Sequence, residues 1–191
     1  MLIVEHRINT AAALARVPRA HGVEVDLRCD GGRLVLRHDP AGPAEPFDAW
    51  LDGFGHALLI ANVKEEGLED LVREALGDRP FFFLDQSAPF LIRGALAGER
   101  RSAVRVSDWE APSLALKLAG RVQWIWLDVF QSGPPVDDAV VRDLRAAGYR
   151  ICLVSPELHA LERAPEIPAL RAWAEPLGIE AVCTKRPADW S

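Results

Sequence analysis

The chain alternates short strand-like runs with helix-like runs from one end to the other, and this order restricts its fold more than any other feature. The strand-like runs are rich in Val, Ile, Leu, Phe and Trp and often end at Gly or Pro. They span residues 2–6, 23–28, 34–38, 58–64, 81–86, 103–108, 122–130, 150–155 and 180–185. Between most of them apolar residues recur with helical period, as at Leu68, Leu71, Val72, Ala75 and Leu76. Repeated strand–helix units predict a parallel sheet with right-handed crossovers.

One connection departs from this order. The polar segment Cys29-Asp30-Gly31-Gly32-Arg33 is a tight turn between two strand-like runs, and it predicts a β-hairpin after the second strand. Setting the second arm of the hairpin aside leaves eight strands with helices between them. The predicted fold is therefore an α/β (β/α)8 TIM barrel formed by one domain over residues 1–191, and an open doubly wound sheet is the alternative.

Composition narrows the class of protein. The chain is 49% apolar and 26% charged, which is typical of a globular protein rather than a disordered one. A net charge of −6 argues against nucleic acid as a partner. No apolar run approaches the roughly 20 residues of a membrane-spanning helix, and the start carries no signal-peptide pattern. Three widely spaced cysteines fit a reducing compartment, so we expect a cytoplasmic protein.

Polar side chains gather at the carboxyl ends of the strand-like runs. Alternate residues of a strand share a face, and in a parallel barrel the strand ends form the mouth of the active site. Each residue alone has a plain alternative as a solvated strand end, but their recurrence on one phase predicts a shared site. The set comprises His6, Arg7, Glu24, Asp26, His38, Asn62, Lys64, Asp85, Arg105, Trp126, Asp128 and Lys185.

Glu24 and Asp26 form the sharpest local pattern. Two carboxylates on one face of a strand lie about 7 Å apart along the chain, where their charges raise each other's pKa. A hard divalent cation, Mg²⁺ or Ca²⁺, would relieve that repulsion. The alternative is an ion pair with Arg7, Arg28, Lys64 or Arg105.

Two histidines flank this acid pair in the sequence. His6 and His38 both stand at strand ends, and histidine is the side chain best suited to proton transfer near neutral pH. We interpret His21, His56 and His159 as surface residues, because they fall in loops or at helix ends of the expected fold.

Several of these segments resemble motifs of glycerophosphodiester phosphodiesterases, a family that shares a superfamily with the phosphatidylinositol-specific phospholipases C. The opening segments His6-Arg7, Asn9-Thr10, Val23-Glu24-Val25-Asp26 and Arg37-His38-Asp39 carry the likeness. Asn62-Val63-Lys64 is similar to the family's Glu-x-Lys, and residues 181–187 to its closing strand and turn. The chain looks like a short, divergent bacterial-type branch of that superfamily.

This resemblance implies a (β/α)8 barrel of lipid metabolism that cleaves a small phosphodiester with a divalent metal ion. Carried over by position, Glu24, Asp26 and Asn62 would bind the metal, and His6 and His38 would be general base and general acid. Arg7 and Lys64 would neutralise the phosphoryl oxygens. A neighbouring hydroxyl of the substrate can be the nucleophile in this superfamily. Further substrate-binding roles are expected for Asp85, Arg105, Trp126, Asp128 and Lys185.

Two departures from the family pattern keep alternatives open. Asn62 stands where the family has a third metal-binding Glu, and the segment over the substrate mouth is replaced by residues 40–46. An amide oxygen binds a hard cation more weakly than a carboxylate does, although Asp85 or Glu65 could supply charge. The alternative function is a catalytically silent barrel that binds a phosphorylated ligand or partner. A Schiff-base lyase using Lys64 or Lys185 is a third hypothesis.

Overall fold

The computed structural model describes all residues, 1–191, and divides the chain into two compact units. The N-terminal unit is Glu5–Arg93, and the C-terminal unit combines Met1–Val4 with Gly94–Ser191. Strand β1 (Leu2–Glu5) and helix α4 (Ala88–Leu96) run across the residues at which the units divide. Each unit is an α/β structure in which strands alternate with helices. The expectation of a single domain stays a prediction.

The N-terminal unit is built around β2, the longest strand of the chain. β2 (Gly22–Asp30) pairs antiparallel with β3 (Arg33–Leu36), which pairs with the short β4 (Glu45–Pro46). On its other edge β2 pairs in parallel with β5 (Leu59–Val63), and β5 in parallel with β6 (Phe81–Leu84). The helices of the unit are α1 (Ala11–Leu14), α2 (Phe47–Leu51) and α3 (Glu69–Leu76).

Glycine makes the β2–β3 turn possible. Asp30 pairs with Arg33, so only Gly31 and Gly32 connect the strands, and their φ angles are 57° and 82°. Two-residue hairpin turns of this kind need positive φ at both central positions, which glycine adopts without a Cβ penalty. The tight turn therefore lets β3 return directly along β2.

Alternation along β2 separates a core face from a polar face. Val23, Val25 and Leu27 join a cluster of buried apolar residues that includes alternate residues of β5 and β6 and side chains of α2 and α3. Thr10 accepts a hydrogen bond from the backbone N–H of Ala13 (3.1 Å) and caps α1, as its position predicts. The helix-covered core therefore leaves the other face of β2 for polar groups.

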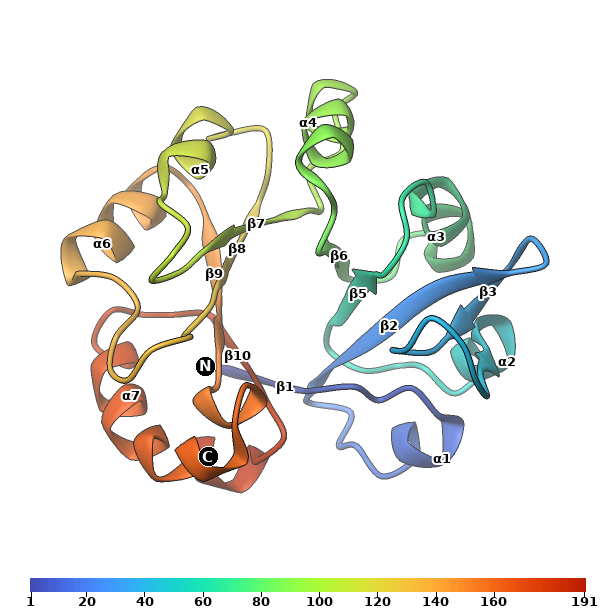
Figure 1. The fold of residues 1–191 in the computed structure, drawn as a ribbon, viewed down its shortest axis with the longest axis horizontal. Helices are drawn as coiled ribbons and strands as arrows, with labels where there is room; N and C mark the ends of the chain where they lie inside the picture. The colour runs from blue at the N-terminus through green and yellow to red at the C-terminus, as the bar shows by residue number, and fades with distance from the viewer. The chain divides into compact units, whose positions relative to one another are not determined.

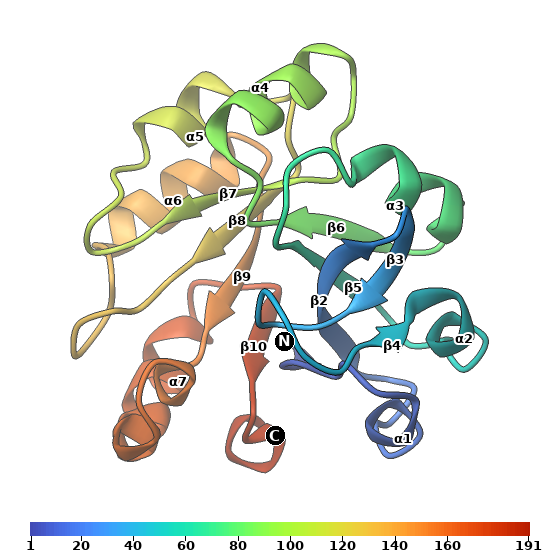
Figure 2. The same ribbon diagram turned by 45° about the vertical axis from the view of Figure 1, so that its right-hand side comes forward.

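The C-terminal unit carries four parallel strands in sequence order, with β1 beside the last of them. These strands are β7 (Ala103–Val106), β8 (Trp124–Leu127), β9 (Arg150–Val154) and β10 (Ala181–Thr184). Helices α5 (Ser113–Lys117), α6 (Asp138–Ala146) and α7 (Ile167–Ala174) lie along one side of this sheet (Figure 1). Figure 2 shows the same arrangement from a second direction. Short 3-10 helices occupy Pro156–Leu158, Leu161–Glu166 and Pro187–Trp190.

The structure differs from the expectations based on the sequence in a few places. The predicted loop 41–46 contains β4, whose two residues include a proline and are too short to show periodicity. The predicted strand 122–130 is confined to β8, which ends at Leu127, so Asp128 begins the loop that follows. Leu71 is 39% exposed, although its spacing places it on the apolar stripe of α3. His56 is buried, so its interpretation as a surface residue is wrong.

Candidate functional site

The candidate site of the N-terminal unit lies on the polar face of β2. Glu24 and Asp26 are both fully buried, opposite the face that carries Val23, Val25 and Leu27. Parallel pairing sets Asp26 directly beside Asn62 of β5. The strand period therefore brings two carboxylates and one amide together, as the sequence predicts.

Glu24 is held by neutral donors rather than by a cation. Its Oε2 accepts a hydrogen bond from the backbone N–H of Arg7 (2.8 Å) and lies 3.7 Å from Nε2 of His6. Its Oε1 accepts from Nδ2 of Asn62 (2.9 Å). Burial, reinforced by the charge of Asp26, raises the pKa of Glu24 from 4.5 to about 7. Glu24 is therefore a carboxyl group that exchanges its proton near neutral pH.

Asp26 is compensated by two cationic side chains. Its Oδ1 lies 3.2 Å from Nζ of Lys64, and its Oδ2 lies 3.8 Å from Nε of Arg7. Asn9 holds Asp26 through two hydrogen bonds: its Nδ2 donates to the carboxylate Oδ2 (2.8 Å), and its Oδ1 accepts from the backbone N–H of Asp26 (2.9 Å). The two neighbouring acids therefore differ in how their negative charge is compensated, since only Asp26 contacts cationic side chains.

Two residues at strand ends adopt left-handed backbone conformations. Arg7 follows β1 with φ 56°, and Asp85 follows β6 with φ 61°. Such angles are uncommon outside glycine and gather at functional sites. Asp85 reaches to 3.7 Å from Nζ of Lys64, although the strand period places it in phase with Phe81 and Phe83 of the core cluster. The left-handed turn thus redirects a side chain that alternation alone would bury.

His38 stands apart from the acid pair. Its Nδ1 lies 2.9 Å from Oδ1 of Asp39, and its carbonyl accepts hydrogen bonds from Arg28 (2.9 and 3.2 Å). It makes no hydrogen bond or ion pair with Glu24 or Asp26. The His38 bond lowers the pKa of the Asp39 carboxyl.

His38 and Asn9 line a cavity of about 480 Å³. Its wall is the 40–46 segment, which Arg37 holds by donating hydrogen bonds to three backbone carbonyls, those of Asp39, Pro40 and Gly42. The volume falls within the usual range for small-ligand pockets.

The donor set at Glu24, Asp26 and Asn62 does not fit the metal ion that the sequence predicts. Each carboxylate oxygen already faces an N–H donor or a cationic nitrogen, and Asn62 turns its Nδ2 toward Glu24. Oδ1 of Asn62 and Oδ1 of Asp26 both lack a hydrogen-bond partner, but Oδ1 of Asp26 lies 3.2 Å from the ammonium of Lys64, whose positive charge opposes a divalent ion there. No group of three or more His, Cys, Asp or Glu side chains is placed to hold a metal ion.

The remaining predicted site residues belong to the C-terminal unit. Arg105 donates a hydrogen bond to the buried Asp128, and Nε2 of His159 lies 2.6 Å from the other oxygen of Asp128. Trp126 is beside Arg105 in the sheet register and is buried, at 5% exposure. Lys185 is exposed, and its backbone N–H donates to Glu157 (3.0 Å). The structure thus brings Arg105 and Asp128 into contact and leaves Lys185 outside that cluster.

Sequence reasoning underrated Asn9 and His159. Asn9 belongs to one of the quoted family-like segments, and that segment was the available signal for its bonds with Asp26. His159 follows Asp128 by 31 residues, so no local spacing connects the two. Its ring also packs against Phe130, with ring centroids 4.5 Å apart.

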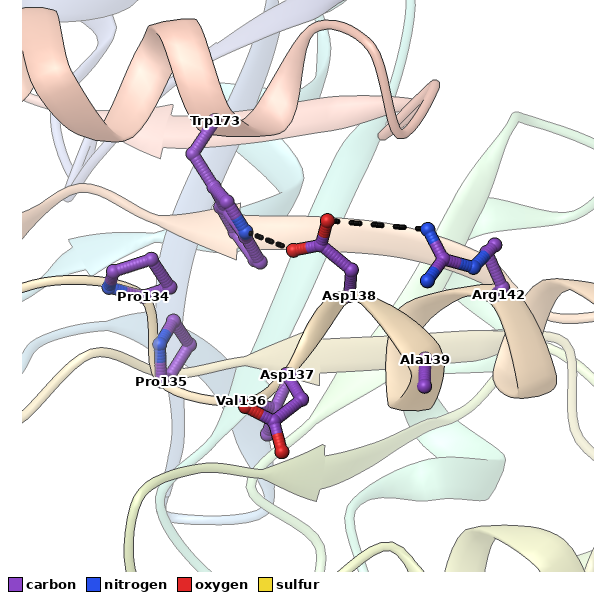
Figure 3. Close-up of a pocket in the computed structure, with 8 residues that line it drawn as sticks. All are labelled: Pro134, Pro135, Val136, Asp137, Asp138, Ala139, Arg142 and Trp173. Atoms are coloured by element: carbon purple, nitrogen blue, oxygen red, sulfur yellow. Dashed lines mark hydrogen bonds and ion pairs between the residues drawn. The ribbon is translucent and has the colours of Figure 1, made fainter.

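A larger pocket of about 760 Å³ lies in the C-terminal unit, at the start of α6 and beside α7 (Figure 3). Three of its polar side chains contact one another, because Asp138 accepts from Nε1 of Trp173 (2.7 Å) and lies 3.9 Å from Arg142. None of the predicted site residues lines it. We therefore place the candidate site at the acid pair.

Comparisons with known proteins bear on the fold. No family model and no curated protein matches the sequence. Among solved structures, the chain is similar to an Oleispira antarctica phosphodiesterase in complex with its product sn-glycerol-3-phosphate, at 20% identity and a TM-score of 0.70. That match covers 100% of this chain and 95% of the other.

A second similar structure is a glycerophosphoryl diester phosphodiesterase from Parabacteroides distasonis. It has 15% identity and a TM-score of 0.69, with 99% of this chain and 84% of the other covered. The chain therefore has the α/β, TIM-barrel-type fold of the glycerophosphodiester phosphodiesterases, and the expected fold class is confirmed. No helix has both the length and the apolar character required to cross a membrane.

Proposed function

We propose that the chain hydrolyses a small phosphodiester at the polar face of β2, with His6 as general base and with Arg7 and Lys64 as the phosphoryl-binding cations. The observation that carries this proposal is that the Arg7 guanidinium makes few contacts within the protein. It makes no hydrogen bond within the protein, its one ion pair with Asp26 is long, at 3.8 Å, and its side chain is 40% exposed. A guanidinium has five N–H donors in a fork that fits phosphoryl oxygens.

Lys64 supplies the second positive charge. Its ammonium lies between Asp26 and Asp85, 3.2 and 3.7 Å away, and its side chain is 18% exposed. The two carboxylates hold the ammonium of Lys64 in place, so that in the proposed complex its charge would lie beside the equatorial oxygens of the phosphodiester. Charge that develops on those oxygens in the transition state is stabilised by preorganised cations.

Proton transfer is assigned to the two histidines. His6 takes the proton from the attacking water, and Glu24, 3.7 Å from its Nε2, orients the ring. His38, beside Asp39 at the mouth of the 480 Å³ cavity, protonates the leaving alkoxide as the P–O bond breaks. The products are a phosphate monoester and an alcohol, and the cavity is the place for the leaving alcohol.

The predicted metal dependence forms no part of this mechanism, because the oxygens of Glu24 and Asp26 are already occupied by protein donors. The similarity to phosphodiesterases of known structure supports the substrate class, and one of those proteins carries sn-glycerol-3-phosphate as its product. For this chain, a glycerophosphodiester is accordingly the first substrate to test.

Asn62 favours the second candidate function, a catalytically silent domain that binds a phosphorylated ligand. The same cations would bind the ligand, and no proton transfer would follow. A Schiff-base role for Lys64 is disfavoured, because its Nζ is engaged in ion pairs with Asp26 at 3.2 Å and Asp85 at 3.7 Å.

The test measures turnover of bis(p-nitrophenyl) phosphate and of a glycerophosphodiester by the wild type, His6→Ala and His21→Ala. His21 is the matched control, since it pairs with Glu5 at 2.9 Å, away from the acid pair. We expect turnover by the wild type and His21→Ala and its loss in His6→Ala. Calorimetric binding of sn-glycerol-3-phosphate without turnover would select the silent binder, and absence of both would refute the phosphoryl site.

A further inference from the structure

A small pocket of about 180 Å³ lies in the N-terminal unit, where β5 and β6 end and α3 begins. Acidic and amide side chains dominate its wall. The polar lining residues include Lys64, Glu65, Glu69, Asp85, Gln86 and Ser87. Neither Glu24 nor Asp26 lines this pocket, which shares Lys64 and Asp85 with the candidate site.

Glu69 is a buried carboxyl group without a cation. The residue is 8% exposed and forms no ion pair. Its Oε1 accepts a hydrogen bond from Nε2 of Gln86 (3.0 Å), and its Oε2 has no hydrogen-bond partner. An ionised carboxylate that leaves water without a compensating charge carries a large desolvation penalty. The amino-terminal end of α3, at which Glu69 stands, offsets only part of that penalty.

Two further buried oxygens of the same pocket are also unsatisfied. Neither Oε1 of Gln86 nor Oγ of Ser87 has a hydrogen-bond partner. The carboxylate and amide oxygens can only accept hydrogen bonds, so they cannot satisfy each other. Carboxylate, amide and hydroxyl oxygens are together the ligands that hard divalent cations prefer.

The cationic side chains near the pocket are engaged elsewhere. Lys64 faces Asp26 and Asp85, and Arg28 pairs with Glu65 at 3.1 Å. No protein cation therefore neutralises Glu69.

We propose that this pocket binds a partly hydrated divalent cation, Mg²⁺ or Ca²⁺, through the side-chain oxygens of Glu69, Gln86 and Ser87. Glu69 supplies the negative charge, the other two supply neutral oxygens, and water completes the coordination. The bound ion would join the first turn of α3 to the loop after β6, which carries Asp85. The pocket shares Lys64 and Asp85 with the candidate site, but none of the three proposed ligands takes part in the proposed hydrolysis.

The experiment is a titration of the full chain with Mn²⁺, followed by electron paramagnetic resonance. We expect the wild type to bind one ion, Glu69→Gln to bind it about a hundred-fold more weakly, and Glu74→Gln to bind it as the wild type does. Glu74 is the matched control because it lies on the same helix and is exposed. Asp26→Asn is included to separate this pocket from the acid pair, and it should leave binding unchanged.

Three outcomes would overturn the proposal. Absence of binding at millimolar Mn²⁺ would show that the three oxygens hold water. Loss of binding in Asp26→Asn with binding kept in Glu69→Gln would place the ion at the acid pair. Equal binding by all variants would show a site elsewhere. Should Glu69→Gln fail to fold, Ser87→Ala takes its place, and the rise in melting temperature that Ca²⁺ gives the wild type should shrink in it.

Discussion

Glu24 of the N-terminal unit and Asp128 of the C-terminal unit are both buried carboxyl groups, one within β2 and one directly after β8, yet their surroundings differ. Asp128 contacts Arg105 and His159 directly and also accepts from the backbone N–H of Val129 (3.0 Å). Glu24 meets two neutral N–H donors, and burial beside Asp26 raises its pKa to about 7. A buried acid with cationic partners is suited to holding structure, whereas one without them is suited to exchanging a proton.

A third buried acid, Glu157, has neutral donors as Glu24 does, but its donors come from several separate segments of the chain. Glu157 is buried in the C-terminal unit, where Ser155, Thr184 and the backbone N–H of Lys185 donate to its two oxygens. Trp190 donates to Ser155 (2.8 Å) and thereby ties the last residues of the chain to this network. Because these bonds join the ends of β9 and β10 to the last residues of the chain, we interpret Glu157 as structural.

The largest expected effect concerns the phosphoryl-binding cations. Lys64→Met should lower phosphodiester turnover about a thousand-fold, because a preorganised charge near the developing anion is lost. Lys117→Met, at an exposed position on α5, is the matched control and should keep wild-type turnover. Steady-state kinetics on both variants provide the measurement. Turnover retained by Lys64→Met would remove Lys64 from the mechanism.

The second effect tests the structural role of Asp128. Asp128→Asn should lower the free energy of unfolding by about 2–4 kcal/mol near neutral pH, because Arg105 and His159 lose their common partner. Asp138→Asn is the control, since Asp138 is half exposed and its change should cost about 0.5 kcal/mol or less. Urea unfolding measures both. A cost for Asp128→Asn no larger than that of the control would contradict the contrast.

The third effect is a gain in the free energy of unfolding rather than a loss, and it depends on pH. The folded-state pKa of Glu24 is raised, so the folded protein binds the proton more tightly, and stability should fall as pH rises from 4.5 to about 7. Glu24→Gln removes this loss and should be more stable than the wild type above neutral pH, by roughly 1–3 kcal/mol. The advantage should vanish below pH 4.5, where both states are protonated. A difference in unfolding free energy that does not change with pH would show that Glu24 ionises normally.

Much of the candidate site follows from strand periodicity. Alternation along residues 23–27 places Glu24 and Asp26 on one face, and the same rule places Asn62 opposite the apolar residues of β5. These predictions succeed because a two-residue period is a local property of any strand. The roles of the site residues remain predictions.

The rest depends on backbone angles and long-range contacts. The left-handed φ of Asp85 breaks the two-residue period at the end of β6. Because aspartate rarely adopts such an angle, the sequence does not predict it. His159 meets Asp128 only through folding, and Glu69 is buried although it lies opposite the apolar stripe of α3. Glu69 stands in the first turn of α3, beside the ends of β5 and β6, and this position buries its side chain although the helical period would expose it.

The central claim is that cationic side chains, and not a metal ion between Glu24 and Asp26, bind the phosphoryl group. It is tested most directly by anomalous diffraction from a crystal soaked with Mn²⁺ and a phosphorothioate diester. We expect the thiophosphoryl group beside Arg7, Lys64 and His6, with no manganese peak between the two carboxylates. A manganese ion bridging Glu24 and Asp26, or a diester bound away from Arg7, would contradict it.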